Sequence, residues 1–253
     1  MKRLGHRGRA LGTMTWIELK LFVREPISLV FTIALPVVVL YVLGGVFGTR
    51  VRADEFRGFA PMRFYTPAYV ALMIASLGLI SLPLHLTNYR ERGVLRRFRA
   101  SSLPLSTVLG AQVVVTALVA LVGGTLLALL AIVTYHIPSP RAIPALLVSF
   151  AVCTASFTAI GVFLAAFMPT ARAAQGAGVM LWFVMLIVSG AGPPPDQLTG
   201  AMRLVGSLLP LKHVILALQD PWLGFGINGP ELLLVGGTAS AAAAVALHRY
   251  RRT

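Results

Sequence analysis

Six long apolar stretches, separated by short polar or charged segments, dominate the pattern of this chain. They cover residues 26–49, 64–89, 104–135, 143–168, 176–191 and 230–247, and their interiors contain no Asp, Glu, Lys or Arg. A helix of about 20 apolar residues crosses the roughly 30 Å hydrocarbon core of a bilayer. The pattern therefore predicts an all-α membrane protein with six transmembrane helices in a single domain, residues 1–253.

Residues 1–25 precede the first apolar stretch and are rich in basic side chains. From residue 13 to residue 25 a helix would be amphipathic, which predicts a helix lying in the membrane interface. Its expected apolar face holds Trp16, Leu19, Phe22 and Val23. Pro36 lies in the middle of the first span and removes a backbone hydrogen bond, so we expect a kink or a close neighbouring helix there.

Residues 90–103 form the most densely charged segment between two apolar stretches. If residues 90–99 are helical, an apolar face and a basic face form on opposite sides. The apolar face holds Val94, Leu95 and Phe98 together with Glu91, and the basic face holds Arg92, Arg96 and Arg99. The basic face suits anionic lipid headgroups and the apolar face suits a groove on a partner protein. Alternatively, these arginines only determine membrane orientation.

Residues 192–229 connect the fifth and sixth apolar stretches and are interrupted by proline and glycine. The sequence Ser189-Gly-Ala-Gly-Pro-Pro-Pro195 opens this region, and Leu208-Leu-Pro-Leu-Lys-His-Val214 follows. These clusters exclude one continuous helix. Two possibilities stay open: an external loop with a little helix, or two short helices that dip into the outer leaflet with their backbone buried in protein.

Composition and charge support a membrane protein with a defined orientation. The chain of 253 residues is 57% hydrophobic and only 12% charged, whereas soluble domains carry about 25% charged residues. With the N-terminus inside, 15 of the 22 lysines and arginines fall on the cytoplasmic side, which predicts two cytoplasmic termini. The net charge of +14 is then explained without a nucleic-acid partner. The basic residues that fit this orientation worst are Arg50, Arg52, Arg57 and Arg63.

The sequence carries no recognisable catalytic or metal-binding motif. It lacks the G-x-x-x-x-G-K-[ST], H-E-x-x-H and G-x-S-x-G patterns, and Cys153 is the sole cysteine, so we predict no catalytic residue, no metal and no disulfide. We expect His85 to be a structural or interfacial histidine rather than a proton relay. Since the interiors of the spans lack Asp, Glu, Lys and Arg, uphill transport would need energy from outside the chain.

The order of the polar motifs resembles one family over nearly the whole chain. Arg-Glu-Arg-Gly at 90–93, Leu95-Arg96-Arg97 and Ser-Leu-Pro-Leu-Ser at 102–106 resemble the intracellular loop of the ABC-2 family. These are membrane subunits of bacterial drug, lipid and polysaccharide exporters powered by ABC ATPases, and the resemblance is to the daunorubicin-resistance-permease type. The Ser-Gly, proline and Leu-Pro-x-x-His segment is similar to the re-entrant external helices of that family.

The resemblance implies roles for two groups of residues. A cytoplasmic coupling helix that contacts the ATPase would comprise Arg90, Glu91, Arg92, Gly93, Val94, Leu95, Arg96, Arg97 and Phe98. An external gate over the translocation path would comprise Ser189, Gly190, Pro193, Pro194, Pro195, Pro210 and His213. The sequence does not indicate which residues bind the cargo.

The resemblance also implies partners and a function. Two ATPase subunits would bind ATP and magnesium, so this chain itself needs no cofactor, and a second permease, identical or similar, would complete the path in the cell membrane. Apolar spans favour export of hydrophobic or amphiphilic drugs, natural products or lipids. Lipid-linked polysaccharide is the alternative cargo. The alternatives from other classes are a passive channel and a polytopic membrane enzyme, for which His85 and His213 are the only weak catalytic candidates.

Overall fold

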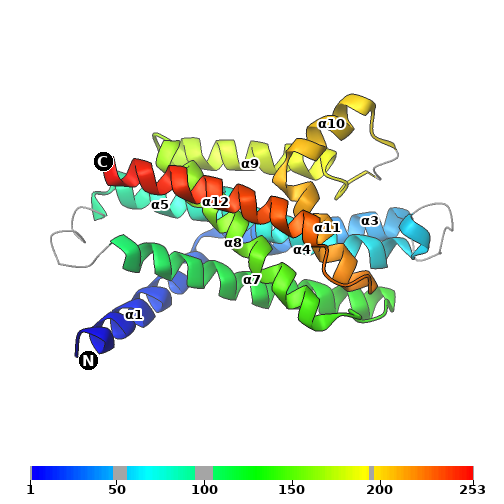
Figure 1. The fold of residues 1–253 in the computed structure, drawn as a ribbon, viewed down its shortest axis with the longest axis horizontal. Coiled ribbons are helices and arrows are strands. Elements are labelled where there is room, and N and C mark those ends of the chain that lie inside the picture. The colour runs from blue at the N-terminus through cyan, green and yellow to red at the C-terminus, as the bar shows by residue number, and fades with distance from the viewer. Residues whose placement is uncertain (1, 48–55, 95–104, 194–196, 253) are drawn as a thin grey trace.

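The computed structural model describes residues 2–47, 56–94, 105–193 and 197–252, and within these ranges it contains helices and no strand (Figure 1). The first helix, α1, spans Lys2–Arg24, and a 3₁₀ turn, η2, spans Phe56–Gly58. Two spans each contain a π-helical turn. Their segments are α2 Pro26–Leu29, η1 Val30–Ala34 and α3 Leu35–Phe47, then α4 Pro61–Ser76, η3 Leu77–Ser81 and α5 Leu82–Glu91. The remaining helices are α7 Leu105–Tyr135, α8 Ile143–Phe167, α9 Ala171–Val188, α10 Gly200–Leu208, α11 Pro210–Leu223 and α12 Gly229–Arg252.

Six helices of the described chain are long and apolar enough to cross a membrane, which confirms the predicted all-α membrane architecture. They are Pro26–Val46, Pro61–Glu91, Thr107–Tyr135, Ile143–Phe167, Ala171–Val188 and Gly229–Arg249. Helix α1 and the C-terminal end of α12 lie toward the same end of the bundle (Figure 1). We call this the terminal end, and it also contains residues 90–94 and the turn at 168–170. The opposite, far end contains residues 56–60, 136–142, α10 and α11.

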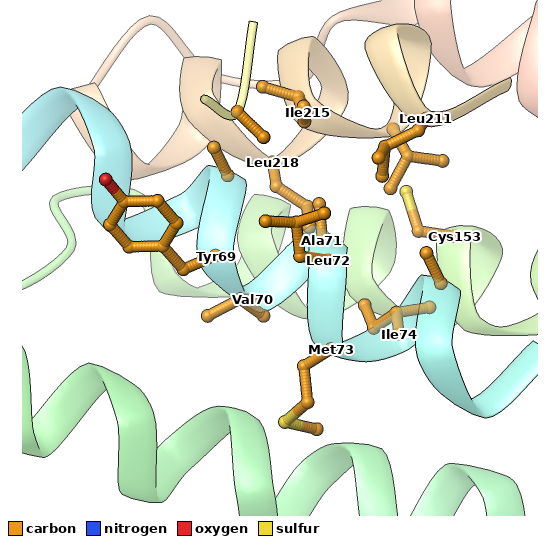
Figure 2. Close-up of a cluster of buried hydrophobic side chains, with 14 of the residues drawn as sticks. Tyr69, Val70, Ala71, Leu72, Met73, Ile74, Cys153, Leu211, Ile215 and Leu218 are labelled. Atoms are coloured by element: carbon orange, nitrogen blue, oxygen red, sulfur yellow. The ribbon is translucent and has the colours of Figure 1, made fainter. Parts of the chain in front are cut away.

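The second span is the centre of the bundle. Its membrane window is 100% buried, against 11–39% for the other five spans, and it contacts α3, α7, α8, α9 and α11. Figure 2 shows its side chains enclosed by neighbouring helices, with Leu211 and Leu218 of α11 on one side and Cys153 of α8 on another. The other spans leave wide apolar faces uncovered, as expected for contact with lipid or a partner subunit.

Each of the two π-helical turns ends two positions before a proline, with one residue between them. Turn η1 is followed by Leu35 and Pro36, and η3 by Leu82 and Pro83. Proline has no N–H and its ring clashes with the carbonyl four residues earlier, and a wider turn relieves both problems. The irregularity predicted at Pro36 therefore takes the form of a π turn, and the same device occurs in the second span.

The two π turns meet inside the bundle, where glycines allow close approach. Thr32 Oγ1 of η1 lies 3.5 Å from Ser81 Oγ of η3, and it accepts a hydrogen bond from Ser76 Oγ at the end of α4 at 3.3 Å. A Cβ added at Gly161 of α8 would overlap the carbonyl oxygen of Gly78 in η3, and one added at Gly178 of α9 would overlap that of Leu79. Helices α8 and α9 therefore touch the backbone of η3 directly, as expected for small residues at a helix crossing.

Several boundaries differ from the predicted ones. Helix α9 begins at Ala171 and not at residue 176, because side chains from outside the helix bind its first N–H groups. The second span begins at Pro61, which suits a first helical position, so Arg63 lies inside the helix and not in the preceding loop. Helix α1 begins at Lys2 and not at residue 13.

The face that α1 turns toward the bundle also differs from the predicted one. Phe22 is buried as expected, but Trp16 and Val23 are 58% and 59% exposed, and Glu18 is only 2% exposed. The buried residues Met14, Glu18 and Phe22 recur every four positions on the side of α1 that packs against α7, where Tyr89 of α5 also contacts Met14 and Glu18. The predicted face was wrong because it took no account of Glu18, whose carboxylate turns inward to accept a hydrogen bond from Tyr89.

Candidate functional site

At the terminal end, Arg90 and Glu91 fasten the second span to the turn between α8 and α9. Arg90 donates hydrogen bonds to the carbonyl oxygens of Ala165, at 3.0 Å, and Met168. Glu91 Oε1 accepts a hydrogen bond from the backbone N–H of Ala171 at 3.1 Å. A helix C-terminus carries partial negative charge and an N-terminus partial positive charge. The cation therefore meets the end of α8 and the anion meets the start of α9.

Two further side chains complete this junction. Thr170 Oγ1 accepts a hydrogen bond from the N–H of Ala173 at 3.1 Å and caps α9. Arg249 of α12 donates from Nε to the carbonyl of Ala166 at 3.1 Å, and its guanidinium lies 4.7 Å from the Phe167 ring centre. Four helices, α5, α8, α9 and α12, therefore share the junction.

The predicted coupling helix does not begin as a separate helix at Arg90. Arg90 and Glu91 are the last turn of α5, which ends where Gly93 adopts a left-handed conformation with φ of +66°. Arg92 is exposed and Val94 is half-buried. The other predicted coupling residues, Leu95, Arg96, Arg97 and Phe98, lie outside the described residues.

A buried polar cluster joins α1 to α5, and the sequence did not reveal it. Tyr89 donates a hydrogen bond from its hydroxyl to Glu18 Oε1 at 2.7 Å. Burial raises the pKa of the Glu18 carboxyl above its ordinary value, although this hydrogen bond and the nearby His85 act in the opposite direction. His85 lies 2.7 Å from the Ser81 carbonyl through Nδ1 and 3.5 Å from Glu25 through Nε2. His85 therefore contacts its own helix and the residue that precedes α2.

At the far end, α10 and α11 form a bent pair with an angle of 82° between them. The bend falls at Leu209, and Pro210 occupies the first turn of α11, where its missing N–H costs nothing. His213 of α11 lies 2.6 Å from Glu231 Oε2 of α12 through Nδ1 and 2.9 Å from the Ser207 carbonyl of α10 through Nε2. His213 therefore joins three helices.

Asp220 is a second junction at the far end. Its carboxylate pairs with Arg57 at 2.6 Å and accepts a hydrogen bond from Asn228 at 2.6 Å. The Arg57 guanidinium also lies 4.5 Å from the Phe225 ring centre. This pairing compensates the charge of an arginine that fitted the predicted orientation poorly. Arg50 and Arg52, from the same group, lie outside the described residues.

The predicted gate residues that precede α10 lie at the end of α9. Ser189 is the last residue of the helical turn and its N–H donates to the Met185 carbonyl at 3.0 Å, and Gly190 follows with φ of +86°. Pro193 is half-buried, and Pro194 and Pro195 lie outside the described residues. A Cβ at Gly206 of α10 would overlap the Val188 carbonyl. Because Gly206 neighbours Ser207, α10 links the end of α9 to His213.

Sequence reasoning identified Glu91 but missed the other acidic partners at these junctions. Glu18, Asp220 and Glu231 are close in space to Tyr89, Arg57 and His213 but far from them along the chain or on another helix. Their only sequence signal is that they are rare acidic residues next to apolar stretches. Among the described residues, no group of three His, Cys, Asp or Glu side chains could hold a metal ion.

Together, the six spans and the two helix junctions define a polytopic membrane protein. The chain matches the family described as ABC-2 type transporter over residues 9–221, which is more than half of its length. It therefore belongs to the ABC-2 type transporter family. Membership makes it a membrane-embedded permease subunit of an ABC transport system and implies partnership with an ABC ATPase. No curated protein matches the chain.

Proposed function

We propose that this chain is the permease subunit of an ATP-driven exporter in the cell membrane, with both termini in the cytoplasm. Two copies of a separate ATPase would bind ATP and magnesium, and a second permease, identical or similar, would complete the path. The cargo is a hydrophobic or amphiphilic compound such as a drug, natural product or lipid. The observation that carries this proposal is the fastening of the buried second span to α8 and α9 through Arg90 and Glu91.

This junction suits the transmission of a push from the ATPase. A force on residues 91–98 would reach α8 and α9 through the Arg90 and Glu91 hydrogen bonds at the terminal end. The same force would travel along the enclosed second span, because close-packed helices move as rigid bodies. At the far end of that span, Gln219 of α11 donates a hydrogen bond to the Phe64 carbonyl at 3.0 Å. The second span thereby connects the coupling segment to the bent helix pair.

The bent pair is our candidate for the external gate. Ser189, Gly190, Pro193, Pro194, Pro195, Pro210 and His213 form or flank α10 and α11. Two short helices that contact the ends of α9, α4 and α12 can tilt as a unit when the second span moves. We propose that this tilt opens a route outward between the two permease subunits.

The apolar interior supports a hydrophobic cargo. Within the described part of the chain, Arg63 is the one arginine or lysine that lies inside a span at the far end, and its guanidinium is buried against the Phe59 ring. The middle of every span lacks Asp, Glu, Lys and Arg. Such walls would have to strip the hydration of a polar sugar without replacing its hydrogen bonds, at a cost of several kcal/mol. Lipid-linked polysaccharide is therefore the second candidate cargo.

The test is to replace the apolar face of the coupling segment. The triple variant V94D/L95D/F98D, co-expressed with a P-loop ATPase candidate from the same organism, is expected to reach the membrane but to lose ATPase association and stimulation. The conservative variant V94L/L95V/F98L is the control and should retain both. Normal pull-down of the ATPase by the triple Asp variant would contradict the proposal. Cargo flux through the chain alone, without ATP, would instead favour a passive channel.

A further inference from the structure

A cavity of about 270 Å³ lies between α4, α7, α8 and α11, toward the far end of the bundle. Pro67 and Val70 of α4, Ala128 of α7, Phe150 of α8 and Trp222 of α11 contribute to its walls. Figure 2 labels Val70 of α4 and Leu218 of α11, which both line the cavity. Leu129 of α7 and Leu147 of α8 also line the cavity and are 53% and 55% exposed, so the cavity reaches the lipid-facing surface between these two helices.

Three side chains that can donate hydrogen bonds line this cavity or stand next to its wall residues at the far end. Arg63 is one helical turn before the wall residue Pro67, and its Nε is buried without a hydrogen-bond partner. Trp222 lines the cavity, and its indole Nε1 is likewise buried and unpartnered. Arg141 follows the wall residue Pro140 and is exposed. A buried donor of this kind destabilises the protein if nothing pairs with it.

The two arginines converge on the C-terminal end of α11. Arg63 lies 3.5 Å from the Leu223 carbonyl, and the side chain of Arg141 lies 2.9 Å from the position that a Cβ on Gly224 would take. Their positive charges are close enough to repel each other, and in the described part of the chain neither has a carboxylate partner. A single long hydrogen bond to a helix end does not balance two guanidinium groups. The site therefore favours an anion.

The form of the site defines the chemistry of that anion. Guanidinium groups bind phosphate through paired, charge-assisted hydrogen bonds, and tryptophan is typical of the headgroup level of a membrane. The wall below is apolar and opens to the bilayer. The volume is just under the roughly 300–1,000 Å³ of pockets that enclose drug-sized ligands, so it suits part of one hydrocarbon chain.

We propose that this cavity binds an anionic phospholipid from the leaflet at the far end. The phosphate is held by Arg63, Arg141 and the Trp222 indole, and one acyl chain enters between α7 and α8. This inference depends on the membrane placement of the chain and not on the proposed export. Failure of the ATPase experiment leaves it intact.

The test is native mass spectrometry of the purified full chain, titrated with phosphatidylglycerol or with phosphatidylcholine of identical acyl chains. The wild type is expected to retain one phosphatidylglycerol in preference to phosphatidylcholine. R141Q, at an exposed position, should lower that preference roughly fivefold, the equivalent of about 1 kcal/mol for one basic residue at a membrane surface. A128F, which fills the cavity, should abolish retention of both lipids at this site.

Matched changes elsewhere separate this site from general effects. R203Q removes an exposed arginine of α10, and A117F adds the same ring to an exposed position of α7 that does not line the cavity. Both should bind lipid as the wild type does. The proposal is overturned if the wild type shows no preference for phosphatidylglycerol, or if R141Q and A128F both behave like these controls.

Discussion

The carboxylate of Glu91 accepts a hydrogen bond from the backbone N–H of Ala171, although 80 positions separate the two residues in the chain. Glu91 is the last residue of the second span, and its side chain binds the first N–H group of the fifth span. Arg90, its neighbour, does the same for the end of the fourth span. Any displacement of the segment that follows Glu91 consequently acts on three spans together.

Removing the Glu91 carboxylate should weaken the start of α9. In E91A the N–H of Ala171 loses its acceptor, and helix caps of this kind contribute about 1 kcal/mol to the free energy of unfolding. Thermal unfolding in detergent measures the change. T170A, which removes the other cap of α9, should lower stability by a similar amount but leave α5 attached, so only E91A should also reduce ATPase stimulation. Equal ATPase stimulation in both variants would contradict a coupling role for Glu91.

Gly178 should not tolerate a side chain, whereas Gly176 on the same helix should. A Cβ at Gly178 overlaps the Leu79 carbonyl, and a Cβ at Gly176 meets nothing within 4 Å. We expect G178A to lower the free energy of unfolding by about 1–3 kcal/mol through overpacking. G176A should be neutral or stabilising by up to about 1 kcal/mol, since alanine favours helix more than glycine. Thermal unfolding of the pair tests this contact; equal stability would refute it.

Glu18 should make stability depend on pH. Because its pKa in the folded protein is raised above 4.5, the folded protein binds a proton more tightly than the unfolded chain does. The stabilising effect of the proton is complete below about pH 4.5 and is lost as pH rises through the folded pKa. Unfolding of the wild type between pH 4 and pH 8 should show this decline, and E18Q should show a flatter profile. The same slope in both proteins would exclude Glu18 as its source.

His213 should hold the bent helix pair in place. H213A loses the contacts with Glu231 and Ser207, and the loss of such partly buried hydrogen bonds costs about 1–3 kcal/mol. Hydrogen exchange of the α10 backbone should therefore accelerate by roughly fivefold or more. K212A, one residue earlier, should exchange like the wild type. Unchanged exchange in H213A would mean that α10 is held by other contacts.

The lengths of the apolar stretches predicted the six spans, because a helix that crosses a bilayer needs about 20 consecutive apolar residues. Such stretches can be recognised in a single sequence. Where α9 begins was not predictable, because Glu91 comes from a distant part of the chain. The π turns were not predicted either. Pro36 signalled an irregularity, but a proline in a sequence does not distinguish a kink from a π turn.

The candidate site divides in the same way. Arg90, Glu91 and His213 were identified from two motifs, each of which is made of residues only a few positions apart. In the structure each of the three side chains contacts another helix. Glu18 was missed because a carboxylate in an amphipathic helix ordinarily faces water, and only Tyr89 makes its burial favourable. Pairings between remote side chains require the fold itself.

The enclosure of the second span also bears on how the protein is made. Its neighbours α7, α8, α9 and α11 all follow it in the sequence, so a nascent chain inserts this helix into lipid before most of the surface that will cover it has been synthesised. Arg63 and the polar groups around η3 are then exposed to hydrocarbon, or to its boundary with the headgroups, until the later helices cover them. Biogenesis of the subunit therefore finishes only when its last third has been translated, and a prematurely terminated chain would be a substrate for membrane quality control.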